Sequence, residues 1–488
     1  MRVRLWKCWV FLAPAATLCT GSLGAEERSA PMLELRLMTA VSSRTSIPGM
    51  PVHAMVIAPF RAGDRVIPAG TLVHGRLRFA KRVGLGLLRE TAKMAIDFTE
   101  LEPASGPGIP IVSRLAEVDN ARERVDRKGV IRGIRATESF SHRVGYRFLN
   151  LAMAHPAGFV PLLVLQTCIF HFPNPEIEYP TGTDLKVELR EPLPGDAGIR
   201  ETTSPELNTA GSEELNALVN AAPFWAVSPG RKDPVDIVNL VFLGSEDAIR
   251  SAFEAAGWIA PRRVSATARF SVMRAGAELR ALPDAPMRTL MIDGEAADMS
   301  WQRSLNDTAK RHHLRIWKSA GEWRDREVWL SAATHDIDMR ISLKHDGVTH
   351  VIEPKIDLER EKVVNDLRMT GCVDTVHYVD RPEAKRFDEG IDRKELQTDR
   401  RVAVVVLNAC EKPLSFQSSA EAFARPSKAT RVTRTVTLST KNYFLRCNWP
   451  WRIWDTGYMG VRKLVSWNKE RSERRAREAA ARTASSTN

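Results

Sequence analysis

The sequence predicts a mixed α+β protein, in which a β-barrel-like or sandwich domain precedes an α/β domain with a mixed sheet and a basic tail. Three observations lead to this prediction. The first part of the chain contains short segments that alternate apolar and polar residues, as half-buried strands do. The second part contains a strand, a Gly-Ser turn and a helix in succession, which is typical of an α/β sheet. The last part is rich in arginine and tryptophan.

Length and composition indicate a globular protein of ordinary composition. The 488 residues suffice for two or three domains. A hydrophobic fraction of 43% and a charged fraction of 27% exclude a disordered chain. The 71 basic and 59 acidic side chains give a formal net charge of +12. Six cysteines without a Cys-x-x-Cys pair exclude a disulfide-dense scaffold and a zinc ribbon.

Residues 1–25 have the plan of a secretory signal peptide. A basic start is followed by an uncharged apolar run over residues 8–19 and by small residues at 22–25. We therefore expect an exported protein, located in the periplasm or at the outer membrane; an uncleaved N-terminal anchor is the alternative. Cleavage leaves four cysteines, which can form one or two disulfides whose pairing the sequence does not assign: Cys168, Cys372, Cys410 and Cys447.

Residues 31–192 form the predicted barrel-like domain. Three of its segments, Leu33–Ser43, Ile67–Leu77 and Tyr179–Leu189, resemble strands of the barrel in TrbI-like conjugal-transfer proteins. The resemblance implies a barrel and an envelope location. Residues 148–170 carry no charge and are long enough to span a bilayer, but two prolines interrupt them. We expect a buried or interfacial segment there, with a membrane span as the alternative.

The elements that follow are predicted from caps and periodicity. Residues 193–232 read as a linker with one helix that begins at Ser212. In the α/β domain, residues 233–410, an apolar strand leads into a helix capped by Ser245. A hairpin is expected around residues 345–347, and a helix follows Pro354 and ends at Gly371.

The tail, residues 411–488, is predicted to bind an anionic surface. Its segment 430–440 is rich in threonine and valine, which favours a further strand. Tryptophan together with basic side chains suits a membrane interface, so lipid or another anionic polymer is expected and nucleic acid is less favoured. The candidate residues are Trp449, Trp451, Arg452, Trp454, Arg462 and Lys463.

Histidines and carboxylates gather late in the α/β domain. Six of the eleven histidines lie between residues 312 and 377, which is the composition of a metal or acid–base site. Adjacent strand residues face opposite sides, so His312 and His313 cannot share one pocket. The candidate ligands of a divalent metal are His313, His335, His350 and Asp336, with Glu353 or Asp357 as the catalytic base. The favoured interpretation of the group is nevertheless a buried, hydrogen-bonded polar network, and the metal site and an anion-binding pocket are the alternatives. No nucleotide-binding motif is present.

Three segments in this region, RHHLRIW (311–317), VWLSAATHDI (328–337) and THVIEPKIDLERE (349–361), carry a more specific resemblance. With the strands around them, they resemble the LssY C-terminal domain family over residues 233–408. That family has no established catalytic activity, and it also occurs behind membrane-embedded phosphatase domains. The PSGH motif of those phosphatases is not found here, so their chemistry is not implied. Asp399 is followed by Arg400, where the family pattern leads us to expect glycine. The polar and aromatic residues of the motifs are Arg311, His312, His313, Trp317, Trp329, His335, Asp336, His350, Pro354, Asp357, Glu359 and Arg360.

The sequence therefore predicts an exported envelope protein that acts as a non-catalytic binding or assembly module near the membrane. The first alternative is a metal-dependent hydrolase of a phosphorylated or lipid-derived substrate. The second is nucleic-acid binding through the basic tail.

Overall fold

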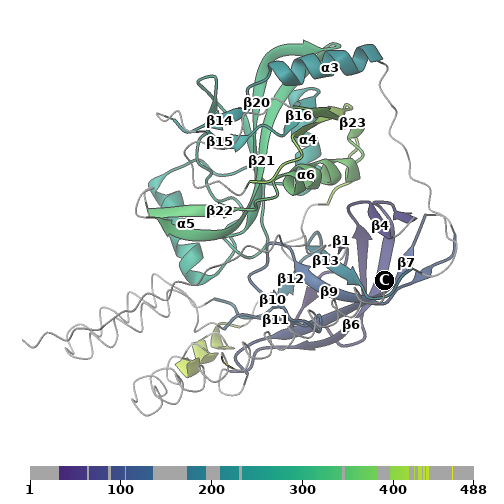
Figure 1. Ribbon diagram of the computed structural model, residues 1–488. Helices are drawn as coiled ribbons and strands as arrows, with labels where there is room; N and C mark the ends of the chain where they lie inside the picture. The colour runs from purple at the N-terminus through teal and green to yellow at the C-terminus, as the bar shows by residue number, and fades with distance from the viewer. Residues whose placement is uncertain are drawn as a thin grey trace, which may run out of the picture.

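The computed structural model places a barrel-like sheet beside a mixed sheet (Figure 1). It describes residues 32–62, 65–85, 89–104, 106–135, 173–193, 209–229, 234–342, 347–381, 396–416 and a few residues between 423 and 464. The predicted signal segment 1–25, the uncharged segment 148–170 and the six tail candidates from Trp449 to Lys463 lie outside the described residues.

The first sheet is antiparallel and nearly closed. Its strand order is β10-β11-β7-β6-β3-β1-β13-β9, with β8 beside β7. The edge strand β9 also contacts β7 and β10, so the sheet curls round on itself. Leu33, Leu35 and Leu37 alternate along β1 and are buried in the core, as the period of two predicts. The strands are β1 (Met32–Leu37), β3 (Pro51–Val56), β6 (Leu72–Lys81), β7 (Lys93–Glu102), β8 (Ile109–Pro110), β9 (Ser113–Val118), β10 (Arg124–Val125), β11 (Ile131–Arg132) and β13 (Asp184–Leu189). Two short strand pairs form separate sheets in the same part of the chain: β2 (Val41–Ser42) with β12 (Glu178–Tyr179), and β4 (Phe60–Ala62) with β5 (Arg65–Ile67).

The second sheet is mixed, in the order β19-β20-β21-β16-β24-β23 with β22 beside β21. β16 and β24 are parallel, and the other pairs are antiparallel. This arrangement confirms the predicted fold class. The strands are β16 (Leu240–Leu243), β19 (Met299–Arg303), β20 (Arg311–Trp323), β21 (Arg326–Ser342), β22 (Gly347–Ile352), β23 (Val373–Asp380) and β24 (Arg401–Leu407).

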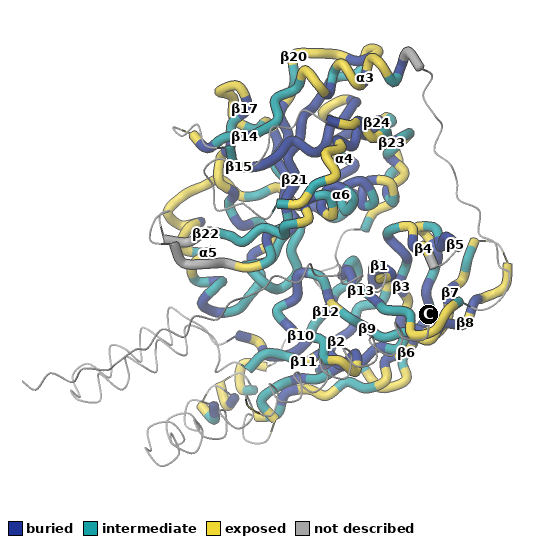
Figure 2. Tube along the Cα trace, viewed as in Figure 1, coloured by how far each residue is buried: buried dark blue, intermediate teal, exposed yellow. Residues whose placement is uncertain are grey.

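Each face of the mixed sheet has its own apolar core. Helices α4 (Glu246–Ala255) and α6 (Asp357–Met369) pack on one face, where Trp329 is buried. Helix α3 (Thr209–Ala221) and the small sheet pack on the other face, where Trp317 is buried (Figure 1). Figure 2 shows the central strands almost wholly buried between these layers. The small sheet has the order β15-β14-β17-β18, with β14 (Trp225–Val227), β15 (Pro234–Ile237), β17 (Met291–Ile292) and β18 (Glu295–Ala296). Helix α5 (Ala266–Glu278) contributes to a separate, small cluster of buried apolar residues.

Most of the local predictions for this domain are confirmed. The Ser245 side chain accepts a hydrogen bond from the backbone N–H of Ala248 and caps α4. Helix α6 begins shortly after Pro354 and ends before Gly371, whose φ of +77° is the left-handed conformation that glycine favours. Strands β21 and β22 form the predicted hairpin. Helix α3 begins at Thr209, so Ser212 lies inside it and is not its N-cap.

The strand predicted for residues 430–440 is wrong, because the described residues between 428 and 438 are helical. Strand preference depends strongly on tertiary context, and here the helix occurs together with a tertiary contact. Arg434 is largely buried against the barrel, with its Nη2 atom 3.1 Å from the Glu176 carboxylate. The same guanidinium donates to the carbonyl oxygens of Val83 and Gly84. This part of the tail is therefore fixed to the barrel.

Two further features bear on the predictions of compartment and membrane contact. Cys372 and Cys410 form a disulfide between the end of α6 and the segment after β24, with their Cα atoms 4.7 Å apart. Among the helices that the structure describes, none has both the length and the apolar character needed to cross a membrane.

Candidate functional site

The β20–β21 hairpin positions the histidines of the family motifs. The two strands pair so that His312 lies opposite His335, and Arg311 lies opposite Asp336. Successive side chains on a strand point to opposite faces of the sheet. The hairpin therefore carries two separate polar clusters, one on the face that α6 covers and one on the other face.

The first cluster, which we call the interdomain cluster, joins the hairpin to α6 and to the barrel. His312 is buried, with Nδ1 2.6 Å from Oε2 of Glu359 and Nε2 2.7 Å from Oδ2 of Asp119. The His335 ring stacks on the His312 ring at a centroid distance of 4.1 Å. Its Nε2 atom lies 2.9 Å from Oδ1 of Asn120. Asp119 and Asn120 follow β9 of the barrel, so the cluster spans both sheets.

The charges of this cluster are set by its two carboxylates. Burial alone would lower the pKa of His312, but Glu359 and Asp119 outweigh it and raise this pKa to about 10. Burial and the adjacent charge of His312 lower the pKa of His335 to about 3. Although burial opposes it, His312 holds the pKa of Asp119 well below its usual range. At neutral pH, His312 is thus a cation between two anions, and His335 is neutral.

The second cluster, on the opposite face, is centred on Asp336. Its carboxylate accepts a hydrogen bond from Nε of Arg311 at 3.0 Å. It also lies 3.2 Å from Nε2 of His313 and 3.2 Å from Nδ1 of His350. Burial would raise the pKa of Asp336, but these neighbours, His313 above all, hold it well below its usual range. Burial lowers the pKa of His350. Asp336 therefore works as the anionic centre of a salt-bridged network.

A third group of motif residues joins the start of α6 to β24. Arg360 is buried and donates to Asp399 at 2.7 and 2.9 Å and to Asp357 at 3.2 Å. Asp357 also accepts hydrogen bonds from the Thr398 hydroxyl and the Asp399 backbone. Arg400 has a φ of +64°, the left-handed conformation that explains why glycine was expected there.

Of the four residues that the sequence grouped as candidate metal ligands, the structure brings three together around Asp336 and separates the fourth, His335. His335 lies on the α6 face, whereas His313, His350 and Asp336 lie on the other, so the three histidines do not converge on one point. Neither proposed base joins them. Asp357 is held at the start of α6, and the Glu353 side chain accepts a hydrogen bond from the Lys355 backbone at 3.3 Å. The expectation that His312 and His313 face opposite sides agrees with the structure.

Sequence reasoning missed Asp119 and Asn120. Asp119 is 193 residues away from His312 in the chain, and no motif links the two. One local signal was available, since an Asp-Asn pair after an alternating strand favours a turn, and Asn120 has a φ of +51°. That signal predicts a turn and does not indicate which residues the turn contacts.

A second buried network, which we call the ion network, also joins the two sheets. Arg36 of β1 and Asp184 of β13 are paired at 2.7 Å. Asp366 of α6 is fully buried and accepts from Arg36 at 2.8 Å and Lys362 at 2.8 Å. Arg303 of β19 contacts both aspartates, at 3.2 and 3.3 Å. Burial opposes ionisation of Asp366, but Lys362 and Arg36 outweigh it and lower the pKa of Asp366 to about 2.

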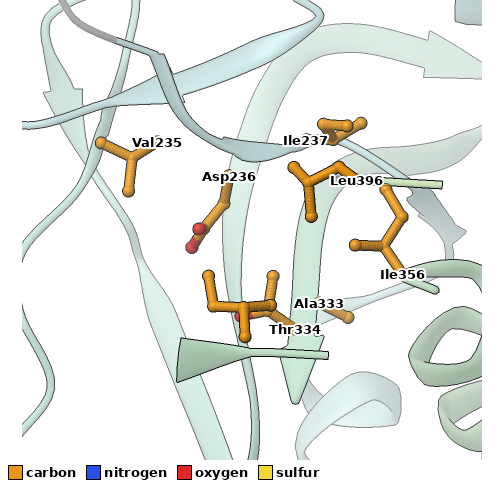
Figure 3. A pocket seen from close by; sticks show the side chains of 8 residues that line it. Val235, Asp236, Ile237, Ala333, Thr334, Ile356 and Leu396 are labelled. Atoms are coloured by element: carbon orange, nitrogen blue, oxygen red, sulfur yellow. The ribbon is translucent and has the colours of Figure 1, made fainter. Parts of the chain in front are cut away.

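Two pockets in the described residues lie away from the interdomain cluster. The first has a volume of only about 10 Å³, room for about one water molecule. Its lining is mostly apolar, and Asp236 is its one carboxylate (Figure 3). Asp236 is paired with Arg315 at 3.0 Å. The second, about 360 Å³, opens where β16 and β24 end and includes Ser245 and Arg326. Neither pocket is lined by His312, His335 or Asp336.

Most of the mixed sheet, its two histidine-bearing faces and the Asp357–Arg360 group fall in one matched region, and most of β24 follows that region. Residues 227–402 match the model of the LssY C-terminus family. The resemblance predicted from the three motifs is confirmed, and we call this region the LssY C-terminus domain. No curated protein matches the chain. His312, His335 and Glu359 lie inside the LssY C-terminus domain, whereas Asp119 lies in the barrel before it.

Proposed function

We propose that this protein is an exported envelope protein in which the barrel and the LssY C-terminus domain act together as a non-catalytic binding or assembly unit. The observation that carries this proposal is the pairing of the motif residues. In the LssY C-terminus domain, His312 and Asp336 each lie in a buried group of opposite charges, and the buried Arg360 is paired with the partly exposed Asp399. Groups of this kind hold elements in place, whereas a hydrolase needs its acid, base and ligands to meet at a pocket.

Contacts between the two sheets support a single working unit. Arg36, Arg303 and Lys362 converge on Asp184 and Asp366 from both sides. A buried pair that loses one partner leaves an unpaired charge, at a cost of about 3–5 kcal/mol. Separating the barrel from the LssY C-terminus domain would break several such pairs at once. We infer that any partner meets the two domains as one surface.

Export is supported by the N-terminal segment and by the disulfide. Residues 1–25 have the basic, apolar and small-residue regions of a signal peptide. A Cys372–Cys410 disulfide is stable in an oxidising compartment. Fractionation tests this part of the proposal. The full chain is expected in the periplasmic or outer-membrane fraction. A variant that lacks residues 2–25 is expected to remain in the cytoplasmic fraction. Equal cytoplasmic location of both would contradict export.

The proposed partner is an anionic membrane surface, bound by the tail. We would measure flotation of the mature chain with vesicles of phosphatidylcholine and phosphatidylglycerol. The test variant replaces Arg452, Arg462 and Lys463 with alanine. Each basic residue near such a surface contributes about 1 kcal/mol, so the three together predict a loss of about 100-fold in partitioning. The control variant removes three exposed barrel charges, Arg76, Arg82 and Arg89. An equal effect in the two variants would exclude the tail as the membrane contact.

A further inference from the structure

Three side chains of the interdomain cluster are arranged as metal ligands. Asp119, His312 and His335 each offer one ligand atom, and these atoms all lie within 4.8 Å of one another. Two of the residues come from adjacent strands of the LssY C-terminus domain, and the third comes from the barrel. Two imidazoles and one carboxylate are a donor set that suits zinc, and also iron and nickel.

The surroundings of His312 match those of a metal-binding histidine. Such histidines donate their second ring N–H to a carboxylate, which fixes the tautomer and the orientation of the ring. Here Glu359 lies 2.6 Å from Nδ1 of His312, which leaves Nε2 directed at Asp119. Glu359 is buried, and its second oxygen, Oε1, has no hydrogen-bond partner among the residues described.

The cluster also suits a dication by its charge. Asp119 and Glu359 contribute two negative charges, and one shared proton on His312 compensates only one of them. A divalent ion in place of that proton makes the sum zero. Asn120 supplies one more oxygen beside His335, at 2.9 Å from Nε2. Zinc–ligand distances of about 2.0–2.1 Å place tetrahedral ligand atoms roughly 3.3 Å apart. Ligand atoms at the 4.8 Å limit would have to approach by about 1.5 Å, whereas Nε2 of His312 and Oδ2 of Asp119, at 2.7 Å, would have to move apart slightly.

We propose that Asp119, His312 and His335 bind one divalent transition-metal ion, of which zinc is the expected one, and that this ion ties the barrel to the LssY C-terminus domain. On binding, the ion takes the position of the proton between His312 and Asp119, and that proton is released to solvent. Glu359 keeps its hydrogen bond to Nδ1 of His312 and so orients the ring. This site differs from the set that the sequence indicated, since His313 and His350 lie on the other face.

The test uses the mature full chain, because the isolated LssY C-terminus domain lacks Asp119. The protein is stripped with a chelator, titrated with zinc in a calorimeter and analysed for metal by mass spectrometry. The variants are Asp119→Asn, which preserves shape, and His335→Ala. The matched control is His350→Ala, which removes a histidine from the opposite face of the same hairpin. Circular dichroism reports folding, and cobalt(II) absorption gives a second readout of coordination.

We expect one zinc ion per chain in the unmodified protein and in His350→Ala. Loss of a ligand should weaken binding by about 100-fold or more, since even the partners of ligands change affinity by about 10–100-fold. Zinc should also raise the urea midpoint of the unmodified protein and leave that of Asp119→Asn unchanged. The proposal is overturned if the folded protein binds no zinc or cobalt, in which case the cluster is a buried imidazolium bridge. Equal binding by Asp119→Asn also overturns it. If His335→Ala fails to fold, the near-isosteric Asp119→Asn decides the question.

Discussion

Replacing Asp366 with asparagine tests whether the ion network holds the two domains together. Asp366 is fully buried and accepts hydrogen bonds from Arg36, Lys362 and the Trp258 indole, at 2.8, 2.8 and 3.0 Å. Asparagine keeps the size of the side chain and an oxygen for Trp258. It removes one of the two negative charges that face the three cations. The substitution therefore isolates the electrostatic contribution.

The lowered pKa of Asp366 gives the direction of the effect: although burial opposes ionisation, Lys362 and Arg36 stabilise the anion in the folded state. Removing one partner of a buried ion pair costs about 3–5 kcal/mol, because the remaining charge stays buried. We expect Asp366→Asn to lower the free energy of unfolding by about 3 kcal/mol.

The assay is urea unfolding of the mature chain at pH 7, followed by tryptophan fluorescence and circular dichroism. The control is Asp284→Asn, the same substitution in an ion pair with Arg262 whose side chains are 40% and 38% exposed. Exposed pairs contribute up to about 1 kcal/mol, so this control should change little. The reasoning is refuted if both variants lose equal, small amounts of stability. A double-mutant cycle with Lys362→Gln should then give a coupling energy near zero, whereas we expect more than about 1 kcal/mol.

Three further predictions follow from the described contacts. The pKa of Asp366 is lowered in the folded state, so the ionised carboxylate stabilises the fold. This stabilisation is fully present above the unfolded pKa of 3.8 and is lost as the pH falls through about 2. Acidification should therefore destabilise Asp366→Asn less than the unmodified protein. Replacing Cys372 and Cys410 with alanine opens a loop with a sequence separation of 38, and the chain-entropy relation predicts a loss of about 4 kcal/mol in urea unfolding. A reducing agent should cause the same loss of stability in the unmodified protein and none in the variant that lacks the two cysteines. Asn239 is buried, and its side chain forms hydrogen bonds with both the N–H and the C=O of Ala333 at 3.0 Å. Asn239→Leu should therefore lower the free energy of unfolding by about 3 kcal/mol, whereas Asn216→Leu on the exposed face of α3 should lower it by less than about 0.5 kcal/mol. Equal losses would contradict the stabilising role of these two hydrogen bonds.

The local elements followed directly from the sequence because each depends on neighbouring residues. The alternation of Leu33, Leu35 and Leu37 predicts a half-buried strand wherever that strand lies. Ser245 before two acidic residues predicts the start of α4, since a serine hydroxyl can accept a hydrogen bond from a backbone N–H in the first turn of the helix. The opposite faces of His312 and His313 follow from the geometry of one strand. The motifs that identify the LssY C-terminus domain are equally local in the chain.

Segments with conflicting local signals required the tertiary structure. The valines and threonines near residue 434 favour a strand, but the contact of Arg434 with Glu176 on the barrel accompanies a helix. His350 lies in β22. The register between β22 and β21 shifts between Asp336 and Asp338. Because a shift of one residue moves a side chain to the other face, no spacing rule could assign the partner of His350.

The fold class, most of the longer strands of the barrel, the capped helix α4 and the family of the second domain could all be predicted from the sequence. These features arise from side-chain periodicity and from hydrogen bonds within a few residues. Three contacts could not be predicted: Asp119 with His312, Asp184 with Asp366 through shared cations, and the disulfide between Cys372 and Cys410. These contacts join distant parts of the chain, and two of them cross from one domain to the other. They depend on how the folded surfaces fit each other, which no local pattern encodes.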